Sequence, residues 1–193
     1  MKILNNIIIY CAVLVVVSSC SDNNYVPKPY GYPRISFPEK EYKDIDSNLP
    51  YSFKIPVYSN LIRLEEQQEG INWVDINFPQ FKGSLHISYW TINNDKDSYF
   101  EDARRMVYKH TIRAESIKET RFENVDKKVY GLLYELSGDA ASNIQFVLTD
   151  STHHFLRGAL YFMSKPNADS LAPVVDFMKK DIVAIMESCE WKN

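Results

Sequence analysis

The residues Val17-Ser18-Ser19-Cys20 have the clearest chemical meaning in this sequence, because small residues before a cysteine are typical of a bacterial lipobox. They end an apolar run over residues 7–17, whose eleven residues are too few to cross the roughly 30 Å hydrocarbon core of a bilayer. A run of this length is typical of a signal peptide. We therefore expect residues 1–19 to be removed and Cys20 to carry the lipid that anchors the mature chain to a membrane.

A second group, Asp150-Ser151-Thr152-His153-His154, contains the residue types of a hydrolase triad. A triad requires a nucleophile, a base and an orienting acid placed together in three dimensions, and no GxSxG nucleophile elbow occurs in the chain. Asp, Ser and Thr between two strands are also explained by turn formation alone. The sequence therefore predicts a turn. The alternative is a hydrolase that uses Ser151 and His154, which requires about 2.6–3.2 Å between the hydroxyl and a ring nitrogen inside a pocket.

No metal site, cofactor site or catalytic site is predicted. His86 falls in a predicted strand and His110 on the apolar stripe of a predicted helix. His153 and His154 are adjacent in the chain, and adjacent strand residues point to opposite faces. The segment 138–142 is too poor in glycine for a phosphate-binding loop, and it joins two predicted strands instead of opening a helix.

The charge and cysteine content of the mature chain argue against a nucleic-acid-binding protein and against a disulfide-bonded fold. Removal of residues 1–19 takes away Lys2 and no acidic residue, which leaves 21 basic against 25 acidic residues and a formal charge of −4. A nucleic-acid-binding protein would show a concentrated basic footprint instead. Cys11 leaves with the signal and Cys20 is lipidated, so Cys189 alone keeps a thiol and no intramolecular disulfide forms. We expect Cys189 to be buried.

Alternating apolar and polar residues predict strands separated by turn residues. The predicted strands cover residues 51–57, 71–78, 85–92, 117–122, 129–136, 143–148 and 154–163. A helix is predicted over residues 98–111, where Ser98 and Glu101 have the spacing of a capping box. A second helix, capped by Asp169 or Ser170, closes the chain.

These elements predict an α+β fold in which an antiparallel sheet packs with two amphipathic helices in a single domain over residues 51–193. The helices cover either one face of the sheet or one face each, and the sequence leaves both arrangements open. The thirteen tyrosines also allow two interpretations, a protein interface or a tyrosine-rich sheet face.

Residues 20–50 are predicted to form a tether. They contain five of the nine prolines, which favour an extended chain, at positions Pro27, Pro29, Pro33, Pro38 and Pro50. The same segment also contains aromatic residues that a purely solvated linker would lack, namely Tyr25, Tyr30, Tyr32, Phe37 and Tyr42. We therefore expect part of this arm, over residues 34–42, to lie against the domain or against a partner.

Distinctive stretches follow one another along nearly all of the mature chain, and the longest of them is Leu148-Thr149-Asp150-Ser151-Thr152-His153-His154-Phe155-Leu156-Arg157-Gly158-Ala159-Leu160-Tyr161-Phe162. The others are residues 27–29, 31–34, 51–53, 73–78, 81–83, 103–114, 130–131, 138–142, 166–167 and 169–170. In their order and extent they resemble the gliding-motility lipoprotein D family (GldD) of the Bacteroidetes.

The resemblance implies a non-enzymatic envelope lipoprotein without a cofactor, required for gliding in a machinery tied to type IX protein secretion. The expected partners are a membrane, through lipidated Cys20, and other envelope proteins of that apparatus, but no nucleic acid. The expected location is the cell envelope, facing the periplasm, on either the inner or the outer membrane. Two alternatives stay open: the hydrolase using Ser151 and His154, and a small-ligand-binding lipoprotein with an apolar pocket of about 300 Å³ or more on the concave face of the sheet.

Overall fold

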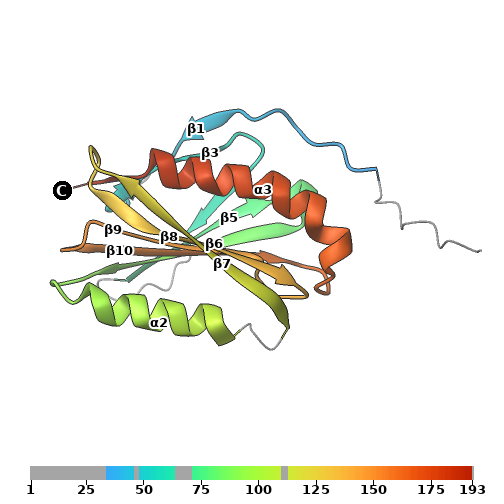
Figure 1. The fold of residues 1–193 in the computed structure, drawn as a ribbon. Helices are drawn as coiled ribbons and strands as arrows, with labels where there is room; N and C mark the ends of the chain where they lie inside the picture. The colour runs from blue at the N-terminus through green and yellow to red at the C-terminus, as the bar shows by residue number, and fades with distance from the viewer. Residues whose placement is uncertain (1–33, 46–47, 64–70, 110–112, 193) are drawn as a thin grey trace, which may run out of the picture. The chain divides into compact units, whose positions relative to one another are not determined.

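The fold is built around a seven-stranded antiparallel sheet (Figure 1). Across the sheet the strands are β4 (Asn60–Arg63), β5 (Ile71–Phe78), β6 (Gly83–Thr91), β10 (His154–Phe162), β9 (Ile144–Thr149), β8 (Val129–Gly138) and β7 (Ala114–Asn124). The computed structural model describes residues 34–45, 48–63, 71–109 and 113–192, which belong to one compact unit. Cys20, the signal segment and His110 lie outside the described residues.

Two short ladders flank this sheet, and they divide the strand that was predicted over residues 51–57. In one ladder β1 (Tyr42–Asp44) pairs with β3 (Lys54–Pro56), and in the other β2 (Tyr51–Ser52) pairs with β11 (Glu190–Trp191). The prediction of one continuous strand is wrong because β2 and β3 pair with different partners. Ladders of two or three residues are also too short to show a period in the sequence.

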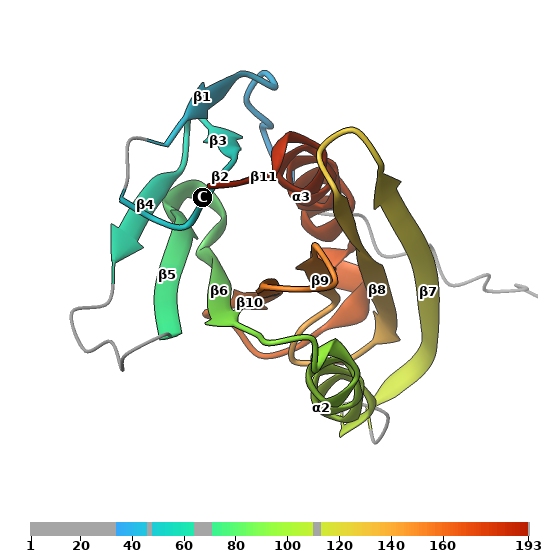
Figure 2. The same ribbon diagram turned by 90° about the vertical axis from the view of Figure 1, so that its left-hand side faces the viewer.

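One helix packs on each face of the sheet, so the α+β prediction is confirmed and the arrangement of the helices is resolved. Helix α3 (Ala168–Ser188) lies on one face and α2 (Lys96–Tyr108) on the other (Figure 1). Figure 2 shows that the sheet curls around α3. The α3 side holds the larger core, which takes alternate residues of each strand such as Val74 and Ile76 of β5. Cys189 ends α3 and is fully buried, as expected.

Both predicted helix caps are wrong. Helix α2 begins after Asp95 without a side-chain cap, and the Ser98 hydroxyl donates to the carbonyl of Asp95 over 2.9 Å instead of forming a capping box. Helix α3 begins after Asn167, whose side-chain oxygen accepts from the backbone N–H of Ser170 at 2.9 Å. The backbone N–H of Ala168, the first residue of α3, donates to the distant Asp139 at 2.9 Å, so a tertiary contact helps to set the start of this helix.

The arm that precedes β1 is held on α3 by a carboxylate with no exposed surface. Asp181 of α3 accepts hydrogen bonds from the hydroxyl groups of Tyr42, at 3.1 Å, and Tyr58, at 2.5 Å. It also forms an ion pair of 2.7 Å with the ammonium of Lys40. Because burial and the nearby carboxylate raise the pKa of Tyr42 to about 12, this hydroxyl stays a hydrogen-bond donor at neutral pH.

Aromatic stacking extends this attachment toward the start of the arm. The ring of Phe37 stacks on Phe177 of α3 at a centroid distance of 4.5 Å, and Ile35 packs against the core. Of the two surfaces expected for residues 34–42, the domain itself is the one that they contact. The compact unit therefore includes residues that the sequence assigned to the tether.

We predict that replacing residues 34–42 by Gly and Ser at equal length destabilises the domain. The exchange leaves the Asp181 carboxylate buried without its cation and without one of its two hydroxyl donors. Loss of one partner of a buried ion pair costs about 3 kcal/mol, and a domain of this size loses about 2–4 °C per kcal/mol. Thermal unfolding of the mature chain should therefore shift down by about 6–12 °C.

The matched control is Glu39→Gln, since Glu39 is an exposed residue of the same arm. It should leave the melting temperature unchanged. A Gly/Ser arm that melts with the wild type would show that the contacts with α3 do not stabilise the domain.

Candidate functional site

The turn between β9 and β10, over residues 150–153, is organised by Asp150. One carboxylate oxygen accepts from the backbone N–H groups of Thr152, His153 and His154 at 2.8–2.9 Å, and the other accepts from the Thr152 hydroxyl at 2.8 Å. Burial alone would raise the pKa of Asp150, but these hydrogen bonds outweigh it and lower the pKa to about 2. The turn predicted from the sequence is confirmed.

Ser151 and His154 do not form the pair that the hydrolase alternative requires. The Nδ1 atom of His154 lies 2.8 Å from the hydroxyl of Tyr89, and its ring stacks on Trp191 at a centroid distance of 4.9 Å. The backbone N–H of Ser151 donates to Thr149 at 2.9 Å. Among the described residues, no hydrogen bond joins the Ser151 hydroxyl to His154. The two residues help to build and pack the turn.

The imidazole of His86 pairs with an acidic group. His86 lies 2.6 Å from the carboxylate of Asp75 on the neighbouring strand. Over the described ranges, which leave out His110 and Cys20, no group of three or more His, Cys, Asp or Glu side chains could hold a metal ion.

A cavity of about 350 Å³ lies between the first half of α3 and strands β7 to β9. Its lining residues are Ser116, Lys118, Glu135, Leu136, Ser137, Gly138, Asn143, Ile144, Ala168, Leu171, Ala172, Val175, Asp176 and Lys179. Within this lining, Glu135 pairs with Lys179 at 2.5 Å and with Lys118 at 3.5 Å. The volume meets the size required by the small-ligand alternative, but ion pairs occupy part of the lining.

A more extended site lies on the α2 side of the sheet, beyond the area that α2 covers. Helix α2 lies over β9 and β10, and no helix of the described residues covers β5 or the first part of β6. On this face, strand pairing aligns side chains in three adjacent rows that run across β5, β6 and β10. The eight residues of these rows other than alanine are called the candidate interface. They are Trp73, Ser88 and Arg157, then Asp75 and His86, then Asn77, Ser84 and Tyr161.

The candidate interface combines aromatic surface with polar groups, a composition typical of protein interfaces. Trp73 and Tyr161 are half-buried, and the ring of Tyr161 lies 5.3 Å from that of His86. On the opposite face the same strands bury residues such as Ile76, Leu85 and Leu160. The alternating pattern predicts these strands only as sheet elements. Aromatic residues at positions that alternate with core residues are the signal that could have identified this face.

An arginine without an acidic partner lies at the edge of this face. One terminal nitrogen of Arg157 donates to the side-chain oxygen of Gln145, which is only 1% exposed, at 2.6 Å. The Nε atom of Arg157 and the Nε2 atom of Gln145 are buried and have no hydrogen-bond partner among the residues that the structure describes. Burial lowers the pKa of Arg157, and Tyr161 partly offsets this effect. Buried donors without an acceptor are rare in folded proteins, so these two donors are an unusual feature of this face.

Most tyrosines of known position contribute to the fold itself. Tyr51, Tyr89 and Tyr134 are buried in the two cores, and Tyr42 and Tyr58 bind Asp181. Tyrosine content therefore does not by itself mark an interface in this protein.

Comparison with known proteins supports the resemblance seen in the sequence. A family described as gliding motility lipoprotein GldD matches residues 22–191, which confirms that resemblance over nearly the whole mature chain. No curated protein matches the chain. In the part of the chain that the structure describes, no helix is long and apolar enough to span a membrane.

We predict that Asp150→Ala lowers the free energy of unfolding by about 2 kcal/mol at pH 7. The folded-state pKa of Asp150 lies below its ordinary value of 3.8. The carboxylate therefore stabilises the fold above pH 3.8, and this contribution is lost as the pH falls toward about 2. Urea unfolding at pH 7 and pH 3 should show that the difference in the free energy of unfolding between wild type and variant is smaller at pH 3. Asp126→Ala, in the exposed β7–β8 turn, should unfold with the same free energy as the wild type at either pH.

We also predict that Ser151→Gly keeps function and slightly raises stability. Ser151 has a φ of 75°, in the left-handed region that favours glycine, so relief of strain should raise stability by up to about 1 kcal/mol. Lys128→Gly, at a φ of 52°, is the matched variant and should change thermal unfolding in the same direction. Loss of function in a correctly folded Ser151→Gly protein would instead support a nucleophilic role for this hydroxyl.

Proposed function

The chain belongs to the gliding motility lipoprotein GldD family, and on this premise we propose that it is a non-enzymatic accessory of the gliding machinery and of the associated type IX secretion. In this role it binds and stabilises other proteins of the cell envelope. Membership of the family associates the chain with gliding motility and with the envelope. Binding of partners, the link to secretion and the absence of turnover are the proposed parts.

The observation that carries the proposal is the candidate interface on β5, β6 and β10. A solvated sheet face needs only polar side chains, whereas this face also presents half-buried Trp73 and Tyr161. At its edge, Arg157 and Gln145 hold donors that have no acceptor within the described residues. A partner surface with apolar area would complement the aromatic side chains of this face.

The hydrogen bonds of the candidate catalytic groups support the non-enzymatic part of the proposal. The His154 ring is engaged by Tyr89 and Trp191, and Asp150 uses both of its carboxylate oxygens inside the turn. A general base needs a free ring nitrogen aimed at its nucleophile. His154 and Asp150 instead stabilise the β9–β10 connection.

The proposed anchor is lipidated Cys20, in an envelope membrane with the domain facing the periplasm. More than one acyl chain is needed for stable membrane attachment, as processing of a bacterial lipobox cysteine would supply. Phe37, Lys40 and Tyr42 are held on α3, so the arm is attached to the domain at these residues.

We predict that deletion of the gene impairs surface spreading or export of type IX substrates, and that a Trp73→Ala/Tyr161→Ala protein does not restore them. The double variant removes the aromatic area of the candidate interface and leaves the core on the α3 side intact. It should fold with a melting temperature close to that of the wild type. It should also lose the envelope proteins that co-purify with the wild-type protein from solubilised membranes.

Tyr130→Ala is the matched control, since Tyr130 is a half-buried aromatic residue on β8, away from the candidate interface. It should restore spreading and export. Normal spreading and export in the deletion strain would contradict the assigned process, and full restoration by the double variant would contradict the assigned surface.

A further inference from the structure

We propose that the end of the domain from which the arm leaves is a membrane-contact surface, which binds anionic lipid headgroups and inserts the side chain of Met163 into the bilayer interface. This inference rests on the proposed lipid anchor at Cys20. It concerns a different surface from the candidate interface.

The topology of the sheet gathers several connections at this end. Strands β5, β8 and β10 run in the same direction, because each is separated from the next of the three by one antiparallel strand. Their carboxyl ends therefore share one end of the sheet, which places the connections 79–82, 139–143 and 163–167 together. The arm reaches the same end, where the side chain of Gln80 donates to the carbonyl of Ser36 at 2.8 Å.

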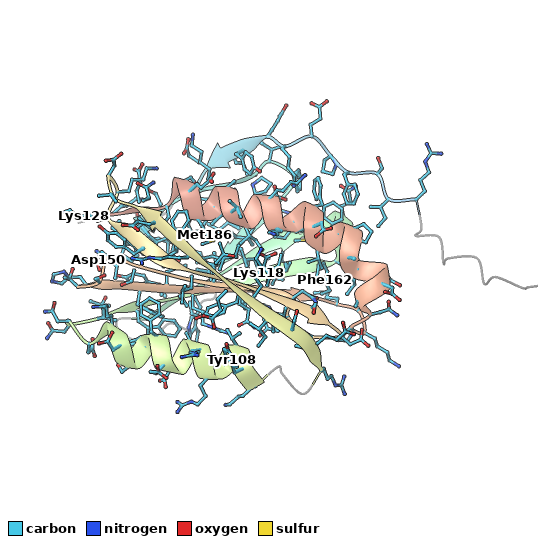
Figure 3. All side chains as sticks on the ribbon, in the orientation of Figure 1. Tyr108, Lys118, Lys128, Asp150, Phe162 and Met186 are labelled. Carbon is cyan, nitrogen blue, oxygen red and sulfur yellow. The ribbon has the colours of Figure 1, made fainter. Side chains whose placement is uncertain are left out.

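The figures show the same separation of the two ends. In Figure 1 the arm leaves the domain on the side where α3 begins. Figure 3 labels Phe162, the last residue of β10, toward that side, whereas Lys128 and Asp150 lie at the opposite end. The surface near Arg34 is therefore the part of the domain closest along the chain to the anchor.

The length of chain between anchor and domain keeps this end near the bilayer. Fourteen residue steps separate Cys20 from Arg34, and a fully extended chain covers at most about 3.6 Å per residue, or about 50 Å in all. A short tether gives the attached domain an effective concentration in the millimolar range. Even a weak affinity of the surface for lipid is then enough to keep it on the membrane for much of the time.

The charges at this end suit an anionic surface, although the mature chain as a whole is acidic. The exposed cations here are Arg34, Lys82, Lys109, Arg113 and Lys165, against the acids Glu115, Asp139 and Asp169. Within the described residues none of these five cations forms an ion pair, whereas Lys118, Lys127 and Lys179 elsewhere do. Asp139, moreover, accepts a hydrogen bond from the first turn of α3. Unpaired cations near a bilayer are attracted by anionic headgroups.

An apolar side chain projects between these cations. Met163 is 83% exposed, the highest value among the large hydrophobic residues of known position. Its backbone N–H donates to the carbonyl of Lys82 at 2.9 Å, which places Met163 next to this basic residue. A second basic residue, Lys165, follows two positions later in the chain. An apolar group flanked by basic residues is the arrangement that binds membrane interfaces, where the apolar part enters the acyl boundary and the charges stay among the headgroups.

The test uses the lipidated protein in vesicles of phosphatidylethanolamine and phosphatidylglycerol. Cys20 is acylated and Cys189 is fully buried, so Met163→Cys provides one reactive thiol for an environment-sensitive fluorophore. Val125→Cys is the matched control, since Val125 is 64% exposed in the β7–β8 turn at the opposite end. Lipids with a spin label on the acyl chain should quench the fluorophore at position 163 and leave the one at position 125 unquenched.

Charge variants test the role of the headgroups. Lys82→Asn suits the left-handed φ of 48° at this position, and it is combined with Lys165→Gln. Each cation near an anionic surface contributes about a fivefold preference for it, so the double variant should lower the ratio of docked to free domain about 25-fold. Vesicles of phosphatidylcholine should reduce quenching of the wild type in the same way.

The outcomes separate this inference from the proposed function. A protein that does not float with vesicles would overturn the anchor at Cys20, on which both depend. A protein that floats but is quenched equally at positions 163 and 125 would overturn the membrane-contact surface alone. Quenching that occurs in native membranes but not in protein-free vesicles would assign the surface to a protein partner and would also overturn the inference.

Discussion

The buried carboxylate of Asp181 is the constraint on which the arrangement of this protein depends. A carboxylate without exposed surface is tolerated only if charge and hydrogen-bond partners replace the water that it loses. All three partners come from before or beside the small β1–β3 ladder: Lys40 and Tyr42 from the arm, and Tyr58 from the chain that follows β3. Satisfying one charge on α3 therefore fixes the course of the arm and the point at which the tether must leave the domain.

The unequal covering of the two sheet faces follows from the curvature of the sheet and the lengths of the helices. The sheet curls around α3, which spans 21 residues and buries its apolar stripe inside that curve (Figure 2). Helix α2 has 13 residues, about 20 Å of helix, and lies against the other face over β9 and β10. Beyond its reach, Trp73, His86 and Tyr161 remain accessible to solvent on β5, β6 and β10. The candidate interface is thus the part of the sheet that the helices of the described residues leave uncovered.

The sequence predicts what depends on a local period and misses what depends on a distant partner. Strand β5 has the predicted bounds, and from Val74 to Phe78 its residues alternate between a core face and a polar face. The start of α3 was predicted two or three residues late, since it depends on Asn167 together with a contact from Asp139. Strands that pair over only two to four residues are too short to show an alternating pattern in the sequence. Asp181 did leave a signal, because it falls on the apolar stripe of α3 between Met178 and Ile182, where a charge requires a buried partner. Its partners lie more than 120 residues away in the chain, and no spacing rule identifies them.

The two proposed surfaces are compatible because the strands connect them. Strands β5, β6 and β10 extend between the end where the arm leaves and the end that holds Asp150 (Figure 3). With the first of these ends on the bilayer, the strands point away from the membrane and the candidate interface faces sideways, along the plane of the membrane. The nine residues of β6 extend for about 30 Å, so this face would stand within reach of neighbours that are anchored in the same membrane. An anchored protein that bound other envelope proteins would need a face that is free for them, and the proposed membrane contact would leave this lateral face free.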